Sequence, residues 1–143
     1  MKVEKLSMDN IFATYVLWKE YIAEINSEST YFKITEEKIK SFVYDHSMTL
    51  NNGSELRLIV KHGRHVVGFM FGSFINRADE PKVVFSVNSL YCKNKEVEQK
   101  LFKVVKESVK SFGIKHIECN EIVRNSLKDE AFKEVLKLYS LEV

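Results

Sequence analysis

The sequence contains few residues that break secondary structure, crosslink the chain or bind metals. Its 143 residues include one proline, five glycines and two cysteines. Because Cys92 and Cys119 form no Cys-x-x-Cys pair, we expect two reduced thiols and no metal site. Pro81 lies in a polar turn, NRADEPK, and no linker rich in proline or glycine divides the chain. We therefore expect a single domain over residues 1–143.

A strong net charge and a long apolar run are also missing. The 22 Lys and Arg residues nearly balance the 20 Asp and Glu residues, so bulk electrostatics give no basis for nucleic-acid binding. No stretch approaches the roughly 18 apolar residues of a membrane span. The start, MKVEKLSMDN, lacks the pattern of a secretory signal. These absences predict a cytoplasmic protein that binds neither nucleic acid nor membranes.

Helical and extended patterns alternate along the chain. Apolar residues at steps of three and four predict helices at 9–25, after Thr35, at 96–113 with a stop at Gly113, and around Leu127, Ala131, Val135 and Leu138. Alternation with period two predicts strands near the N-terminus and at 56–60, 65–75, 82–92 and 114–120. The strand–helix–strand unit at 83–120 predicts parallel pairing through a crossover. This order predicts an α/β (or α+β) fold with one mixed central β-sheet flanked by helices.

The third long strand, KVVFSVNSLYC, contains a shift of phase. Val83, Phe85 and Val87 share one face, but the next apolar residue, Leu90, has the opposite parity. One extra residue near Asn88, which is a β-bulge, explains this pattern. Burial of both faces of the strand explains it equally well.

Three segments of the chain resemble a known family. They are SLYC at the end of the third long strand, LFKVVKESVKSFGIKHIE after it, and DEAFKEVLKL near the C-terminus. In this order they resemble the GNAT family of N-acyltransferases, which depend on acetyl-coenzyme A (acetyl-CoA). The resemblance implies acetyl-CoA or CoA as cofactor and a small-molecule or peptide amine as acceptor.

The resemblance also implies site residues. Ser86 stands at the strand position where the family often has a catalytic glutamate, and Tyr139 lies one turn beyond the position of the family's tyrosine. The residues implied for cofactor binding follow the end of the strand and the start of the helix: Leu90, Tyr91, Cys92, Lys93, Lys95, Val97 and Lys100.

The junction at residues 93–98, KNKEVE, departs from the family's pattern. The family holds the pyrophosphate on a glycine-rich loop at a helix N-terminus, where backbone amides and the helix dipole attract anions. Here there is no glycine, and Glu96 and Glu98 fall in the first helical turn. The lysines of this region are able to hold phosphate only as point charges. We therefore expect weak or absent binding of CoA.

Two functions stay open from the sequence. The first is N-acyl transfer from acyl-CoA to an amine, and the second is a non-catalytic GNAT-like module that binds a protein partner or another ligand. Outside the junction, His116 and Glu118 form the best titratable pair, because they share one strand face.

The C-terminal tail predicts a homodimer. Leu141 and Val143 alternate with Glu142, so the tail is able to form one short edge strand. Unpaired strand edges are usually covered, and pairing across a two-fold axis would cover this one. A monomer whose edge is shielded by the last helix is the alternative.

Overall fold

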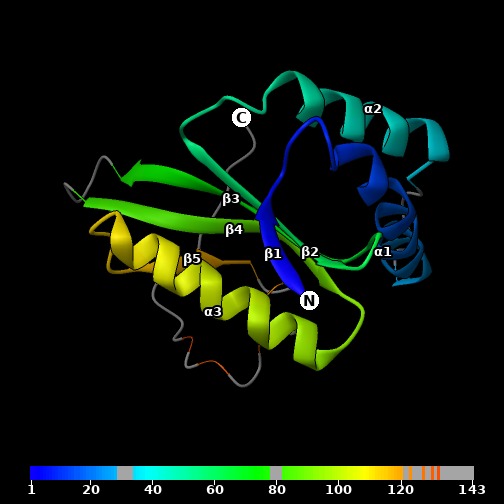
Figure 1. The fold of residues 1–143 in the computed structure, drawn as a ribbon. Helices are drawn as coiled ribbons and strands as arrows, with labels where there is room; N and C mark the ends of the chain where they lie inside the picture. Colours follow the sequence, from blue (N-terminus) through cyan, green and yellow to red (C-terminus); the bar gives the residue numbers. More distant parts are fainter. Residues whose placement is uncertain are drawn as a thin grey trace.

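The computed structural model describes residues 1–28, 34–77, 82–120, 123, 127, 130 and 132. Its elements, in chain order, are β1 (Lys2–Lys5), the 3-10 helix η1 (Ile11–Thr14), α1 (Tyr15–Glu28), α2 (Glu36–Met48), β2 (Glu55–His62), β3 (His65–Arg77), β4 (Lys82–Cys92), α3 (Lys95–Ser111) and β5 (Ile117–Cys119). Figure 1 shows a twisted central sheet with helices packed on both of its faces.

The sheet is mixed and its strands follow the sequence order from β1 to β5. The first four strands pair antiparallel with their neighbours, whereas β4 and β5 run parallel and are joined through α3. The parallel pair confirms the crossover predicted for residues 83–120. The mixed sheet flanked by helices confirms the predicted fold class.

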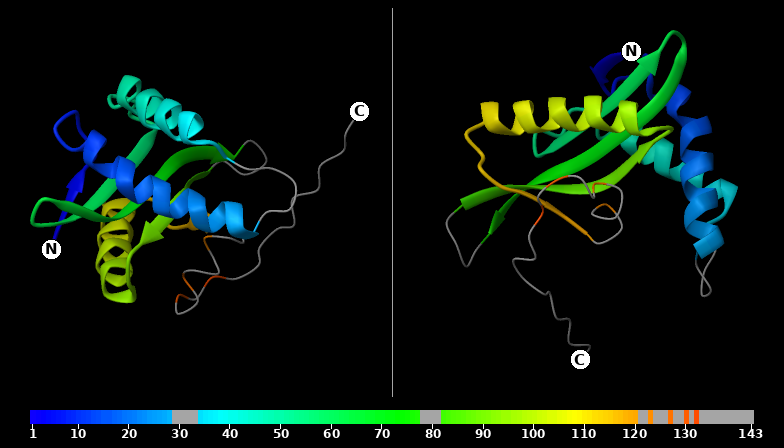
Figure 2. Two further views of the ribbon diagram at one scale, coloured as in Figure 1. Left: turned by 90° about the vertical axis from the view of Figure 1, so that its right-hand side faces the viewer. Right: turned by 90° about the horizontal axis from the view of Figure 1, so that it is seen from below.

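Each face of the sheet has its own apolar core. On one face, α1 and α2 cover a cluster centred on Trp18, whose ring stacks on Phe69 with centroids 4.4 Å apart. On the other face, Leu101 and Val105 of α3 pack over Phe85 of β4. Figure 2 shows α3 on the opposite side of the sheet from α1 and α2. The two faces therefore offer separate surfaces to a ligand.

A β-bulge interrupts β4 at Asn88. Phe71 of β3 pairs with Ser89 and the next residue, Gly72, pairs with Val87, so Asn88 has no partner of its own in the β3–β4 register. This confirms the bulge interpretation of the phase shift. Gly72 lies opposite the bulge, and a Cβ atom there would lie 2.3 Å from Cζ of Phe85. The close approach of the two strands requires glycine at this position.

Two predicted helices differ from the structure in their bounds. The first begins with η1 at Ile11 and continues as α1 to Glu28, so it starts later and ends later than predicted. The long helix α3 ends at Ser111, and Gly113 follows with φ of 76°. The Ile114 N–H donates to the Val109 carbonyl across this turn. Gly113 therefore terminates α3 as predicted.

The predicted fifth strand is shorter in the structure, where β5 spans only Ile117–Cys119. Of the last predicted helix, Ala131, Val135 and Leu138 lie outside the described residues, and Leu127, which is described, lies in a turn. The single domain stays a prediction. No helix in the part of the chain that the structure describes has the length and apolar character needed to cross a bilayer.

The bulge yields a test of stability. Replacing Gly72 with Ala should lower the free energy of unfolding by about 2–3 kcal/mol, because the new methyl group would overlap the Phe85 ring and the Ser86 carbonyl oxygen. Gly53→Ala is the matched control, since a Cβ atom there meets nothing within 4 Å. Urea unfolding of both variants measures the difference. Equal stabilities would show that β3 and β4 approach less closely than described.

Candidate active site

The pairing between β4 and β5 covers only part of β4. Phe85, Ser86 and Val87 pair with Ile117, Glu118 and Cys119. Beyond this point β4 continues to Cys92, whereas β5 ends at Cys119, and the Asn120 side chain accepts a hydrogen bond from the Val123 N–H at 2.9 Å. Among the described residues, nothing in β5 pairs with β4 beyond the bulge. In the part of the chain that the structure describes, β4 therefore has an open strand edge on the side that faces away from β3.

A row of polar residues crosses the sheet beside this open edge. The register pairs Glu55 with Ser73, Ser73 with Ser86, and Ser86 with Glu118. Phe85 and Val87 point to the α3 core, so Ser86, which lies between them, faces α1 and α2. Neighbours in register share a face, so Glu118 points to this same face. The row brings a carboxylate next to the residue that the sequence placed at a catalytic position.

Side chains at the bulge add further polar groups on the face of α1 and α2. The Asn88 side-chain amide donates to Ser73 Oγ at 2.9 Å. Tyr21 of α1 reaches over β4, and its hydroxyl is hydrogen-bonded with Ser89. Burial raises the pKa of Tyr21, the hydrogen bond with Ser89 opposes this, and Glu24 adds to it. Tyr21 therefore stays protonated near neutral pH and is able to donate a hydrogen bond.

The end of β4 has two groups with raised pKa values. Burial raises the pKa of Tyr91, and Glu24 and Glu20 of α1 add to the effect. Burial also raises the pKa of the Cys92 thiol to about 12, with a contribution from Glu98 and an opposing backbone hydrogen bond. A thiol in this state is a poor nucleophile at neutral pH, which argues against covalent catalysis through Cys92.

The junction between β4 and α3 uses its own groups to cap the helix. Asn94 is the N-cap residue, and its Oδ1 accepts from the Val97 N–H at 3.0 Å. Its backbone carbonyl accepts from the Glu98 N–H at 3.2 Å. Glu96 and Glu98 lie in the first turn and stabilise the positive end of the helix dipole. An anion bound here would compete with groups that the chain itself supplies.

All three lysines around this junction have partners on the protein. Lys95 Nζ lies 2.7 Å from Oε1 of Glu98, and Lys93 Nζ lies 3.7 Å from Oε1 of Glu20 on α1. Lys100 donates to the carbonyl oxygen of the first residue at 2.6 Å. The positive charges that the sequence assigned to phosphate binding are therefore already close to glutamates or to a carbonyl group.

The residues predicted for cofactor binding come together at one place. They gather at the end of β4 and the start of α3: Leu90, Tyr91, Cys92, Lys93, Lys95, Val97 and Lys100. The side chains of Leu90 and Val97 are only 4% and 2% exposed, so these two residues offer mainly their backbone to a ligand. Their role in binding stays a prediction.

Of the two residues predicted to be catalytic, the structure describes Ser86 and not Tyr139. Ser86 lies half-buried in β4 beside Glu118. Tyr139 lies outside the described residues. The sequence reasoning missed the hydrogen bonds at the bulge and the N-cap at Asn94, although an asparagine directly before a helix is a recognised capping signal. It singled out Glu118 by strand parity but paired it with His116, which is exposed and precedes β5.

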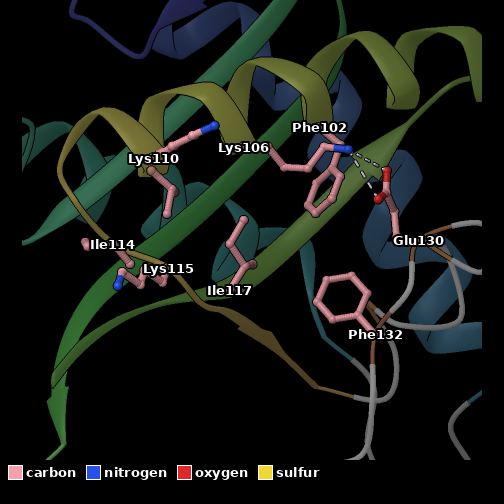
Figure 3. A pocket seen from close by; sticks show the side chains of 9 residues that line it. Phe102, Lys106, Lys110, Ile114, Lys115, Ile117, Glu130 and Phe132 are labelled. Atoms are coloured by element: carbon pink, nitrogen blue, oxygen red, sulfur yellow. Dashed lines mark hydrogen bonds and ion pairs between the residues drawn. The ribbon is translucent and has the colours of Figure 1, made fainter.

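A separate hollow of about 530 Å³ lies on the α3 face of the sheet. Figure 3 shows Phe102 and Phe132 on either side of it, with the ion pair between Lys106 and Glu130 at its rim. It shares no lining residue with the polar row or with the junction at residues 93–98. In the described part of the chain, no group of three or more His, Cys, Asp and Glu side chains is arranged to hold a metal ion.

Comparison with known proteins gives a consistent fold. No protein-family model matches the sequence, and no curated protein matches it either. Solved structures match along the whole chain. One, described as a "probable acetyltransferase", has a TM-score of 0.75 and 14% identity and covers 100% of this chain and 98% of its own.

Two further structures agree with the first. An aminoglycoside 6'-N-acetyltransferase from Acinetobacter haemolyticus has a TM-score of 0.74 and 12% identity, covering 100% of this chain and 98% of its own. A predicted acetyltransferase from Clostridium acetobutylicum, solved with acetyl-CoA, has a TM-score of 0.71 and 12% identity, covering 99% and 95%. The chain has the GNAT fold. Within this fold, the open edge of β4 and the polar row lie next to the bulge at Asn88.

The aromatic cluster behind the site gives a pH prediction. His46 of α2 stacks on Trp18 and makes an edge-on contact with Phe71. Burial lowers its pKa to about 4, with Arg57 adding to the effect and Asp45 opposing it. The folded pKa is depressed below the usual value of about 6.5. The contribution of His46 to stability is therefore complete above pH ~6.5 and is lost as the pH falls towards 4.

Replacing His46 with Gln should remove this part of the pH dependence. The loss in the native protein should be about 1–2 kcal/mol between pH 6.5 and 4, because partial exposure of the ring screens the effect. Urea unfolding at several pH values measures it. His65→Gln, at the exposed start of β3, is the control for the loss of an imidazole ring. Identical profiles for native protein and His46→Gln would contradict the prediction.

Proposed function

We propose that this protein is an N-acyltransferase that moves an acyl group from a thioester to a small-molecule amine. The observation that carries the proposal is the open edge of β4 beside the bulge at Asn88, with Ser86 and Glu118 on the adjoining surface. The GNAT fold supports the same reaction class. One of the similar structures is named as an aminoglycoside N-acetyltransferase, which acts on an amine.

The reaction needs an acceptor for a proton and a support for the thioester carbonyl. The amine nitrogen attacks the carbonyl carbon, the carbon–sulfur bond breaks, and the proton leaves the nitrogen while the thiolate departs. Glu118 is the carboxylate best placed to take that proton, directly or through a water held by Ser86. Backbone N–H groups of β4 near Leu90 and Cys92 are the groups that would polarise the carbonyl.

The charges around the bulge support a cationic acceptor. Glu24 of α1 lies near enough to Tyr91 to raise its pKa, as does Glu20, which also pairs with Lys93. Glu118 lies on the same face, on the other side of the bulge. An amine arrives at neutral pH mostly as an ammonium ion, which carboxylates attract. Carboxylates that only lie nearby stabilise the ammonium ion and do not favour loss of its proton. The proton is lost when one of these carboxylates accepts it.

Acetyl-CoA is the donor that the fold suggests, since one similar structure contains it. The residues at the N-terminus of α3 do not fit its diphosphate, because Asn94 caps the helix and Glu96 and Glu98 occupy the first turn. This observation favours the second candidate function, a non-catalytic module with a GNAT fold. The two functions differ in whether any acyl thioester is turned over.

Turnover is tested with acetyl thioesters and a panel of amines that includes aminoglycosides and polyamines, with thiol release as the readout. Glu118→Gln should lower kcat by about 100-fold, because a general base contributes at least this much. Glu107→Gln on α3 makes the same charge change at an exposed position and should keep full activity. Absence of turnover for every pair of thioester and amine would leave the non-catalytic module as the function.

We also propose that the protein is cytoplasmic and that it forms a homodimer. Residues 139–143, which the dimer prediction uses, lie outside the described residues. Light scattering at ~100 μM, far above the Kd of a specific dimer, on the full chain and on one ending at Tyr139 should give a dimer and a monomer. A monomer in both samples would refute the dimer.

A further inference from the structure

We propose that the donor for this site is a thioester on a pantetheine-like arm that ends without a diphosphate, and that CoA itself is a poor donor. The inference rests on the acyl transfer proposed above and specifies its donor. It follows from two neighbouring parts of the structure. The edge of β4 that would hold the arm is open, whereas the helix end that would hold the diphosphate is already neutralised.

The open edge suits an arm that contains amide groups. Beyond Val87, the described residues of β5 leave the outward-facing N–H and C=O groups of β4 without a ladder partner. An extended ligand with amides pairs with such an edge as an added strand would. The contact uses backbone groups, so the buried side chain of Leu90 and the partly buried side chain of Cys92 are no obstacle. This half of the site needs no charge on the ligand.

The helix end lacks the features that hold a diphosphate. Backbone amides bind phosphate when they are unobstructed and when the positive end of the dipole has no other counter-charge. Here Asn94 Oδ1 takes the Val97 N–H, and Glu96 and Glu98 add negative charge to the first turn. No glycine lets a phosphate approach the backbone of residues 93–98 closely.

The side chains at the junction give no net attraction for an anion. Three lysines face three glutamates: Lys93, Lys95 and Lys100 against Glu20, Glu96 and Glu98. The adjacent hollow of about 380 Å³ has both Lys93 and Glu96 in its lining, together with Met1, His62, Val67, Asn94 and Val97. A diphosphate placed at this junction would lie near equal numbers of lysine and glutamate side chains. Lys93 and Lys95 already lie close to glutamates, so of the three lysines only Lys100, whose partner is a carbonyl oxygen, would gain an ion pair without giving one up.

Binding of three acetyl thioesters tests the inference directly. They are acetyl-pantetheine, which ends in a hydroxyl group, acetyl-4'-phosphopantetheine, which ends in one phosphate, and acetyl-CoA. Calorimetry on the full chain should give acetyl-pantetheine an affinity equal to or higher than that of acetyl-CoA, with a Kd for acetyl-CoA no better than roughly 100 μM. A tenfold or greater preference for acetyl-CoA would overturn the inference.

Salt provides an independent readout. Where lysines hold a diphosphate, raising NaCl from 50 to 500 mM weakens binding severalfold through screening. At this junction we expect the affinity for acetyl-CoA to stay constant, because screening weakens repulsion by the glutamates as much as attraction by the lysines. The affinity for acetyl-pantetheine should not change. A severalfold loss for acetyl-CoA alone would contradict the inference.

A charge variant connects the effect to the first turn of α3. Glu96→Gln should tighten acetyl-CoA about fourfold and leave acetyl-pantetheine unchanged, as expected for one like charge at about 5 Å in solvent. Glu107→Gln makes the same change about 16 Å further along the helix and should alter neither, because this exceeds the screening length. Equal effects of both variants would refute a local role for Glu96.

The outcomes separate this inference from the proposed function. If acetyl-CoA binds tightly and is turned over, acyl transfer stands and the donor inference falls. If acetyl-pantetheine binds at least as well as acetyl-CoA and is turned over, both stand. If no thioester binds at millimolar concentration, both fall, and the non-catalytic module remains.

Discussion

The close approach of β3 and β4 at Gly72 is the constraint on which the rest of the site depends. A side chain at this position would strike the Phe85 ring and the Ser86 carbonyl, so glycine allows β4 to bend where Asn88 is inserted. Among the described residues, β4 and β5 pair at three positions, and all three lie before the bulge. The bulge therefore lies where the edge of β4 loses its described partners in β5.

The bulge also determines which side chains face each surface. Because one extra residue reverses the parity, Leu90 returns to the α3 core while Ser89 meets Tyr21 on the other face. The polar row and the acidic residues of α1 therefore lie on one side, and the buried stripe of α3 lies on the other.

Much of the fold was predictable because local pattern and global topology agree. The stripe of α3, its stop at Gly113 and the crossover to β5 are all short-range signals, and the structure confirms them. The bulge was visible only as one of two interpretations, because parity alone does not distinguish an insertion from burial of both faces. The contacts of Asn88 with Ser73 and of Tyr21 with Ser89 join residues distant in sequence, and no local pattern encodes them.

The ion pairs at the junction of residues 93–98 do not by themselves explain why we expect a diphosphate to bind weakly there. The pair between Lys93 and Glu20 is 3.7 Å long, and both side chains are more than 40% exposed, so it contributes at most about 1 kcal/mol and is easily broken. A ligand with strong attraction would therefore capture Lys93. What opposes a diphosphate is the equal number of charges and the capped helix end, which do not change when one side chain turns away. The selectivity that we propose against a charged arm thus rests on the composition of the first helical turn, and the same turn stabilises the start of α3.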